Sequence, residues 1–133
     1  MLKIVGVAIA ASLSSIVAAA PVYLDCGLAD GEKGVKFSVK LDEASGKITQ
    51  TWADGAAFNA EGFFAANTIS YQEIMIAQDI KITMRYEINR NTLAVNRQSN
   101  IEALNPEYAS LIPPSSEAIK GTCAIVNIGD RKI

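Results

Sequence analysis

The clearest alternation of hydrophobic and polar positions in the chain runs from residue 80 to residue 89. Hydrophobic side chains take the even positions and polar side chains the odd ones: Ile80, Ile82, Met84, Tyr86 and Ile88 against Lys81, Thr83, Arg85, Glu87 and Asn89. A period of two predicts a β-strand with one buried face and one solvent-facing face, which is typical of antiparallel sheets. Polar residues 89–91 interrupt the pattern before it resumes at 92–95. We therefore expect a β-hairpin whose reversal uses asparagine.

A second hairpin is predicted from residues 35–52. Val35, Phe37, Val39 and Leu41 alternate with Lys36, Ser38 and Lys40, and Ile48, Gln50 and Trp52 share one face of the next strand. Gly46 lies in the turn between the two strands and is expected to take a positive φ. Additional strands are expected at residues 23–29 and 121–128.

The strand predicted at residues 68–77 changes its hydrophobic phase partway along. Ile69 and Tyr71 lie on odd positions, whereas the isoleucines that follow, Ile74 and Ile76, lie on even ones. An extra residue in one strand of an antiparallel pair produces such a change. The pattern therefore predicts a β-bulge near residues 72–73.

Two stretches show no regular period. Residues 53–67 are small and apolar apart from three phenylalanines, and we expect a long connection or irregular edge that closes one end of the core. Residues 99–120 are also expected to be mostly irregular. Asn105 followed by Pro106 is typical of a helix start, so one or two helical turns are predicted within 105–111. Long loops in small domains are often binding elements.

The chain has two cysteines, Cys26 and Cys123, near the ends of the predicted domain. In an exported protein such a pair predicts a disulfide, which would place the first and last strands side by side. Together these features predict an all-β fold, an antiparallel meander of about seven strands that is closed or half-closed like a small calycin barrel. A β-sandwich is the alternative, because short alternating strands suit both architectures.

The first residues have the pattern of a secretory signal peptide. Lys3 precedes an apolar run, and the small residues Val17 and Ala19 stand before the expected cleavage point. An uncleaved membrane anchor is the alternative, although a glycine and three serines make the run a poor membrane span. We therefore expect residues 1–19 to be a signal peptide and 20–133 to form a single domain. The protein is predicted to be secreted or periplasmic, with membrane contact only during export.

Charge and composition argue against several classes of function. The chain has 14 acidic and 12 basic side chains, a net charge of -2 and no histidine. The absence of histidine removes Ser/His/Asp and Cys/His catalysis and the common zinc sites, and the near balance of charge argues against nucleic-acid binding. The acidic residues at 30–32 and 42–43 lack the spacing of a calcium loop. We expect no metal and no cofactor.

Short motifs across residues 20–133 resemble a loose group of small exported bacterial and phage proteins. The resemblance rests on an early cysteine, a Phe followed by Thr-Ile-Ser-Tyr, an Ile-Asn-Arg-x-Thr hairpin and a late Gly-x-Cys, which are here Cys26, Phe64 with Thr68 to Tyr71, Ile88 to Thr92, and Gly121 to Cys123. Many of these proteins have glycine after the Thr, where this chain has Leu93. The resemblance implies a β-rich fold and export, and no activity.

Three functions are compatible with this pattern. The first is a non-catalytic module that binds a small apolar ligand or a protein partner, with Phe37, Trp52, Tyr71 and Tyr86 as possible ligand-lining residues. The second is a structural or inhibitory surface protein that acts through loops 53–67 and 99–120. The third and least favoured is a small carboxylate-dependent hydrolase, because no acidic pair is selected by its spacing. We therefore do not expect an enzyme.

Overall fold

The computed structural model describes residues 20–29, 34–108 and 110–126 and shows an all-β protein. The predicted signal peptide lies outside these residues. The strands in chain order are β1 (Val22–Leu28), β2 (Val35–Asp42), β3 (Lys47–Trp52), β4 (Ala57–Glu61), β5 (Phe63–Phe64), β6 (Thr68–Ala77), β7 (Ile80–Asn89), β8 (Ala94–Ala103) and β9 (Ser115–Val126). One turn of 3-10 helix, η1 (Pro106–Tyr108), lies between β8 and β9.

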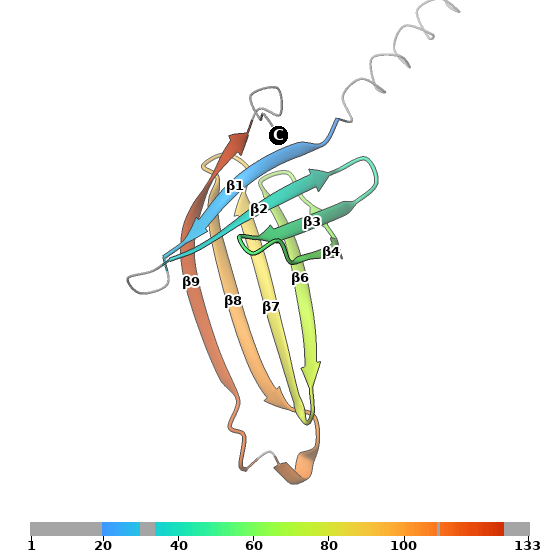
Figure 1. Cartoon of the computed structure of the whole chain (residues 1–133), viewed down its shortest axis with the longest axis vertical. Helices are drawn as coiled ribbons and strands as arrows, with labels where there is room; N and C mark the ends of the chain where they lie inside the picture. Colours follow the sequence, from blue (N-terminus) through green and yellow to red (C-terminus); the bar gives the residue numbers. More distant parts are fainter. Residues whose placement is uncertain (1–19, 30–33, 109, 127–133) are drawn as a thin grey trace, which may run out of the picture.

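The strands form one antiparallel sheet that curls into a nearly closed barrel (Figure 1). Their order across the sheet is β4-β3-β2-β1-β9-β8-β7-β6-β5, so the first and last strands of the chain are neighbours. Cys26 pairs directly with Cys123 between β1 and β9, and the two residues form a disulfide with their Cα atoms 4.0 Å apart. The predictions of an antiparallel barrel and of this disulfide are therefore confirmed. The opening lies between β4 and β5, which are consecutive in the chain.

The core fills the inside of this barrel. Side chains from both halves of the sheet meet there, and the hydrophobic ones with the least exposure, at most 2 % each, are Leu24, Leu28, Val39, Ile48, Tyr86, Ile88 and Val95. The alternation predicted for residues 80–89 is confirmed at its second half, where Tyr86 and Ile88 are buried and Arg85 and Glu87 are exposed. This half of β7 is the part that the other layer of the barrel covers.

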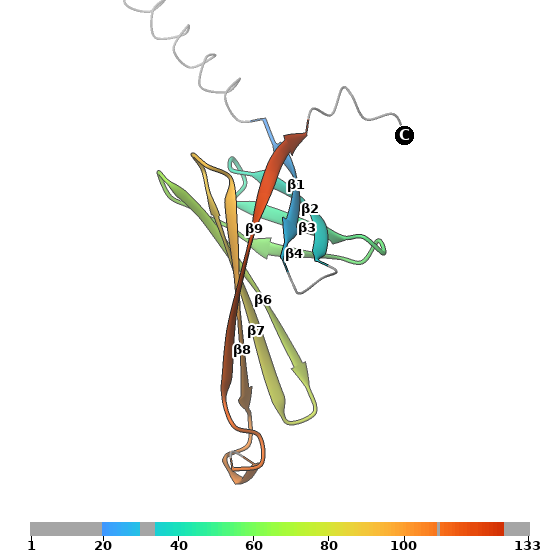
Figure 2. The ribbon, with the colours of Figure 1, turned by 90° about the vertical axis from the view of Figure 1, so that its left-hand side faces the viewer.

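The four long strands extend well beyond the barrel (Figures 1 and 2). Strands β1 to β4 have between 5 and 8 residues, whereas β6 to β9 have between 10 and 12. The surplus length of β6 to β9 forms a twisted four-stranded ribbon below the barrel, and the loop that contains η1 lies at its far end. We call this part, residues 72–84 and 98–118, the ribbon.

The structure corrects three expectations about strand boundaries. β6 and β7 keep one register from Thr68 opposite Asn89 to Ala77 opposite Ile80, so the predicted β-bulge near Gln72 and Glu73 is absent. Residues 53–67 contain β4 and β5, which raises the number of strands among the described residues from about seven to nine. Much of 99–120 is strand as well, because polar parts of β8 and β9 pair with each other along the ribbon.

Both predicted hairpins are present. Gly46 has a φ of 72° in the turn between β2 and β3, as expected. In the turn between β7 and β8, however, the positive φ of 62° belongs to Leu93 and not to an asparagine. The helical prediction near Asn105 is met by the single turn of η1, where Asn105 Oδ1 accepts a hydrogen bond from the Glu107 N–H at 3.0 Å.

Candidate functional site

The candidate site is an apolar pocket of about 310 Å³ at the end of the barrel opposite the ribbon. Its walls come from both halves of the sheet and include the inward-facing Leu24, Leu41, Phe64, Ile69 and Ile88, with Leu93 and Ile125 nearer the surface. Four of these side chains, Leu24, Leu41, Ile69 and Ile88, belong to the buried core. Pockets of this kind, mostly apolar with a few polar groups, are typical small-molecule sites, and this volume is at the small end of their range.

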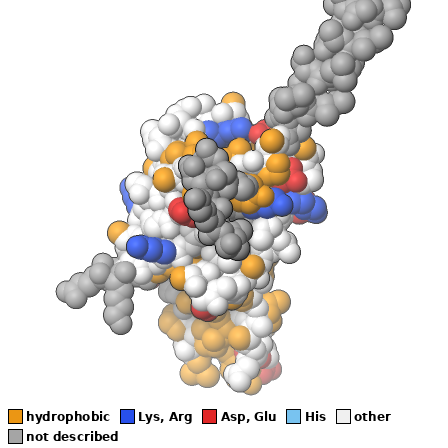
Figure 3. All heavy atoms as spheres, turned by 45° about the horizontal axis from the view of Figure 1, so that its top comes forward, with side chains coloured by type: hydrophobic (Ala, Val, Ile, Leu, Met, Phe, Trp, Pro, Cys, Tyr) orange, Lys and Arg blue, Asp and Glu red, His pale blue; other side chains and the backbone are white. Residues whose placement is uncertain are grey.

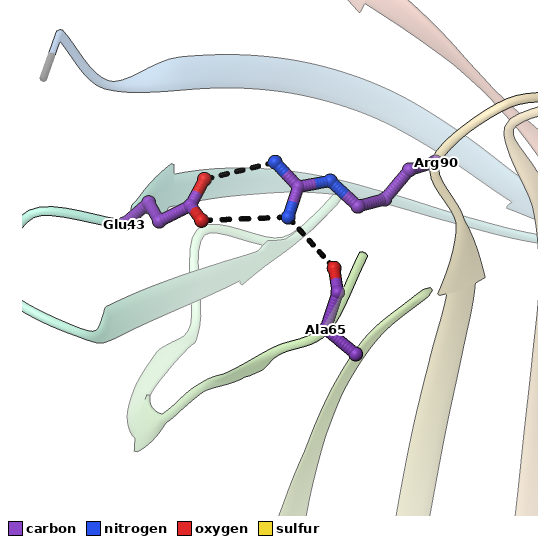
Figure 4. A network of polar contacts seen from close by, with 3 residues as sticks. All are labelled: Glu43, Ala65 and Arg90. Carbon is purple, nitrogen blue, oxygen red and sulfur yellow. Dashed lines mark hydrogen bonds and ion pairs between the residues drawn. The ribbon is translucent and has the colours of Figure 1, made fainter. Parts of the chain in front are cut away.

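An arginine and a glutamate supply the charged groups of the pocket (Figure 4). Arg90 Nη2 donates to Glu43 Oε1 at 2.8 Å, and Nη1 donates to Glu43 Oε2 at 3.4 Å and to the Ala65 carbonyl oxygen at 2.9 Å. Glu43 lies in the β2–β3 turn, Ala65 lies between β5 and β6, and Arg90 lies in the β7–β8 turn. The guanidinium therefore connects three turns that are far apart in the sequence.

The β7–β8 turn holds Arg90 in place through its own hydrogen bonds. The Asn89 side-chain oxygen accepts from the N–H groups of Asn91 and Thr92 at 2.8 and 2.9 Å, and the Arg90 N–H donates to the Asn67 carbonyl oxygen at 2.8 Å. An asparagine that bonds the backbone two residues further on is a common turn device. The position of the guanidinium therefore depends on a turn with fixed backbone geometry.

The charge at the pocket is accessible to a competing anion. The Arg90 side chain is 32 % exposed and that of Glu43 is 57 % exposed. A planar guanidinium binds carboxylate, phosphate or sulfonate oxygens in pairs. A partly exposed surface ion pair contributes little net free energy. Displacement of Glu43 from Arg90 by the anionic group of a ligand would therefore cost little free energy.

The four aromatic residues proposed as ligand-lining lie together in the middle of the barrel. The rings of Tyr71 and Tyr86 stack with centroids 4.9 Å apart, and Phe37 lies 5.7 Å from Tyr86 and 5.6 Å from Trp52. Phe58, which the sequence analysis placed in a connection, completes this group at 6.3 Å from Tyr71. These rings pack against one another. Phe37 and Trp52 line one surface hollow and Tyr71 lines another, so the predicted residues do not line the apolar pocket at Arg90. Their role in ligand binding stays a prediction.

A buried polar group lies beside these rings. The Tyr71 hydroxyl donates to Gln50 Oε1 at 2.5 Å, and Gln50 has no exposed surface. Burial raises the pKa of Tyr71 well above its ordinary value near 10, and the neighbouring Tyr86 raises it further. The two tyrosines therefore remain protonated at neutral pH and act as hydrogen-bonding groups of the core.

Burial also raises the pKa of the Glu73 carboxyl.

Five of the eight large hydrophobic residues that are exposed in the described part of the chain belong to the ribbon. Ile74 and Ile76 on β6 are 48 % and 66 % exposed, and Leu111 in the loop at the tip is 74 % exposed. Figure 3 shows hydrophobic side chains gathered over this end of the molecule. Leu104 and Tyr108 add to the exposed tip.

The described part of the chain has neither a metal-binding cluster nor a membrane-spanning helix. It holds no group of three or more Cys, Asp or Glu side chains placed to bind a metal ion. None of its helices is long and apolar enough to cross a membrane. Comparisons of the chain with models of protein families, with curated proteins and with solved structures find no match.

The sequence analysis did not select the pocket residues. Arg90 was interpreted as part of the Ile-Asn-Arg-x-Thr hairpin and Glu43 as part of a turn, and neither residue was assigned a binding role. The pocket forms because β1, β2, β6 and β7 bring single apolar residues to the same end of the barrel. The signal in the sequence was the position of Glu43 and Arg90, each directly after a strand that the alternation predicts.

Proposed function

We propose that this chain is a non-catalytic binding module for a small, largely apolar molecule that carries an anionic group. The observation that carries the proposal is the apolar pocket of about 310 Å³ with the Arg90 guanidinium among its lining residues. Apolar walls provide affinity through burial, and the guanidinium orients the anionic end. The disulfide supports action in an oxidising compartment, consistent with the expected export.

Two fluorescent probes that differ in charge test the proposal. 1-Anilinonaphthalene-8-sulfonate has an anionic group and N-phenyl-1-naphthylamine has none, and both have aromatic rings that fluoresce in apolar surroundings. We expect the folded protein to bind both probes. Arg90→Gln should lower the affinity for the anionic probe by about tenfold, which corresponds to the loss of one hydrogen bond to a charged group. Its affinity for the neutral probe should be nearly unchanged. Arg85→Gln, at an exposed position on β7, is the matched control.

A second variant tests whether the pocket itself is the site. Ile125 is 66 % exposed and lines the pocket, so Ile125→Trp should narrow the entrance without disturbing the core. We expect this variant to lose both probes while it keeps the unfolding midpoint of the native protein. Binding that is unaffected by both Arg90→Gln and Ile125→Trp would contradict the proposal.

A second candidate function follows from the exposed tip of the ribbon. Leu104, Tyr108 and Leu111 are exposed together in the loop between β8 and β9, which supports a surface protein that contacts a protein partner through this loop. The two functions differ in what accompanies the native protein. A pocket ligand should appear as a small molecule in native mass spectrometry and be lost in Ile125→Trp. A partner of the loop should persist in that variant and be lost in Leu111→Ser.

A further inference from the structure

The outer edge of β6 has unpaired backbone along most of the ribbon. β6 pairs with β7 over its whole length, but it pairs with β5 only at Ile69 and Ser70. Within the described part of the chain, no strand pairs with the other side of residues 71–77. A row of free N–H and C=O groups is a template for another strand.

Two hydrogen bonds show which residues present these free groups. The Ala65 N–H donates to the Thr68 carbonyl oxygen on the β5 side, and the Arg90 N–H donates to the Asn67 carbonyl oxygen on the opposite side. Backbone groups of successive residues in an antiparallel strand point to alternate sides. Gln72, Ile74 and Ile76 therefore direct their N–H and C=O groups away from β7, toward the free side.

The segment at this edge reads almost the same in both directions. Residues 72–78 are QEIMIAQ, which is symmetric about Met75 except for Glu73 and Ala77. When two copies of such a strand pair antiparallel about a two-fold axis at Met75, Ile74 of each copy faces Ile76 of the other. The residues that face each other in this register are also those whose backbone groups are free.

The charge of the segment favours the same register. Glu73 is its only charged residue, and an axis at Met75 places it opposite Ala77 of the second copy. An axis at Glu73 would place two carboxylates directly opposite each other, which is destabilising in a sheet. The outer face of the pair would hold four isoleucines, two from each copy, and in the single chain Ile74 and Ile76 are 48 % and 66 % exposed.

The edge of β6 has few of the features that usually prevent strand pairing. Natural edges are protected by lysine, proline, bulges or inward-pointing charges. Residues 71–77 have no lysine, no proline and no bulge, and Glu73 on the inward face is their only charge. The other free edge of the ribbon, on β9 before it joins β1, differs. It follows Pro113 and Pro114 and carries Glu117 and Lys120. The edge of β6 is therefore the less protected of the two.

We propose that the free edge of β6 is a self-association surface, at which two copies of this chain pair antiparallel through residues 73–77 about an axis at Met75. The two ribbons then form one continuous sheet. A hollow beside the edge, lined by Phe63, Gln72 and Ile74, lies where the added strand brings Ile76 of the second copy. The surface is separate from the pocket at Arg90, so the two proposals stand or fall independently.

Sedimentation of the purified, disulfide-bonded protein over a wide concentration range tests the association. We expect a reversible monomer–dimer equilibrium. Ile76→Lys places two charges in the dimer contact and should raise the dissociation constant by at least about tenfold. Ala118→Lys makes the same kind of change at an exposed position of β9 and should have no effect. Ile76 is 66 % exposed in the single chain, so both variants should keep the native unfolding midpoint.

Crosslinking locates the axis. Only a residue that faces itself across a two-fold axis can form a disulfide with its own copy, so Met75→Cys should yield a covalent dimer under mild oxidation. Glu73→Cys and Ala77→Cys, which face each other and not themselves, should crosslink far less within their own samples. The proposal is overturned if the protein stays monomeric at every concentration, which would leave the edge to a different partner. It is also overturned if the dimer survives Ile76→Lys and Met75→Cys does not crosslink.

Discussion

Removal of the disulfide between Cys26 and Cys123 should cost the barrel a large part of its stability. The bridge joins residues 97 positions apart. On the chain-entropy model, a loop of about 100 residues contributes about 4.7 kcal/mol to the free energy of unfolding by restricting the unfolded chain, and measured values are often lower. Small domains have a total of about 5–15 kcal/mol. We therefore expect a loss of about 2–5 kcal/mol.

The folded barrel should nevertheless survive without the bridge. Cys26 and Cys123 are one pair in a ladder of six between β1 and β9, from Tyr23 opposite Val126 to Leu28 opposite Gly121. The backbone pairing therefore holds these strands together independently of the sulfur atoms. Cys26 is 5 % exposed, so Cys26→Ala/Cys123→Ala also removes a packed atom from the core. The reduced native protein keeps this atom. The difference in free energy of unfolding between the reduced protein and the double variant therefore gives the contribution of packing.

Urea unfolding monitored by tryptophan fluorescence measures the loss. Trp52 is the only tryptophan and contacts Phe37 at a ring distance of 5.6 Å, so its emission reports on the core. The expected result is a native emission spectrum without urea and a lower unfolding midpoint in both disulfide-free forms. A loss below about 1 kcal/mol would refute the entropic reasoning. Loss of the native spectrum in the reduced protein would show that the pairing between β1 and β9 is not stable without the disulfide.

Three other substitutions test local parts of the argument by the same unfolding assay. Gly121→Ala should destabilise by about 1–3 kcal/mol or more, because its Cβ would lie 1.8 Å from the Gly27 carbonyl oxygen, whereas Gly27→Ala meets nothing closer than 3.9 Å and should be tolerated. Asn89→Ala loses the acceptor of two turn N–H groups and should cost about 1 kcal/mol, while Asn89→Asp should retain most of that stability. Burial raises the pKa of the Glu73 carboxyl, so the folded state binds the proton more tightly than the unfolded chain. The protonated carboxyl thus favours folding, and this contribution is lost as pH rises through the raised pKa. Glu73→Gln should stabilise the folded protein by less than about 1 kcal/mol at neutral pH, because the carboxyl is partly hydrated. It should have little effect on stability below about pH 4. A larger gain in stability in acid than at neutral pH would contradict the direction of the pKa shift.

The parts of the fold that could be predicted are those where one strand face is buried and the other is not. The alternation in β2 and in the second half of β7 follows from this environment, because the barrel core covers only one face of each strand. The disulfide was predictable because two cysteines allow one intramolecular pairing. In these cases the local pattern and the tertiary environment agree.

The predicted bulge in β6 was wrong because the change of hydrophobic phase has another cause. Ile69 and Tyr71 face the core, and Ile74 and Ile76 lie on the outer face of the ribbon in an unbroken register. Hydrophobic periodicity assigns apolar residues to the inside, and it has no means of identifying a strand whose outer face is apolar. The same assumption concealed the candidate self-association edge.

The pocket could not be predicted from the sequence, because it depends on which turns meet in space. Glu43 and Arg90 are 47 residues apart and belong to different hairpins. Their ion pair forms only when the pairing of β1 with β9 brings the two halves of the sheet together. No periodicity along the chain encodes that closure, although the disulfide prediction pointed to it.

Unequal strand length accounts for the ribbon and explains why its surface is available for binding. A closed barrel buries only the part of each strand that the opposite layer covers, and β1 to β4 cover only the barrel end of β6 to β9 (Figure 2). The inward face of the uncovered half still carries Met75, Ile80, Ile82 and Ile101, all only partly buried. Apolar residues retained on an uncovered sheet, next to an unprotected edge, contribute little to the stability of the single chain. An interface at this end of the molecule gives them a role that the fold of one copy does not.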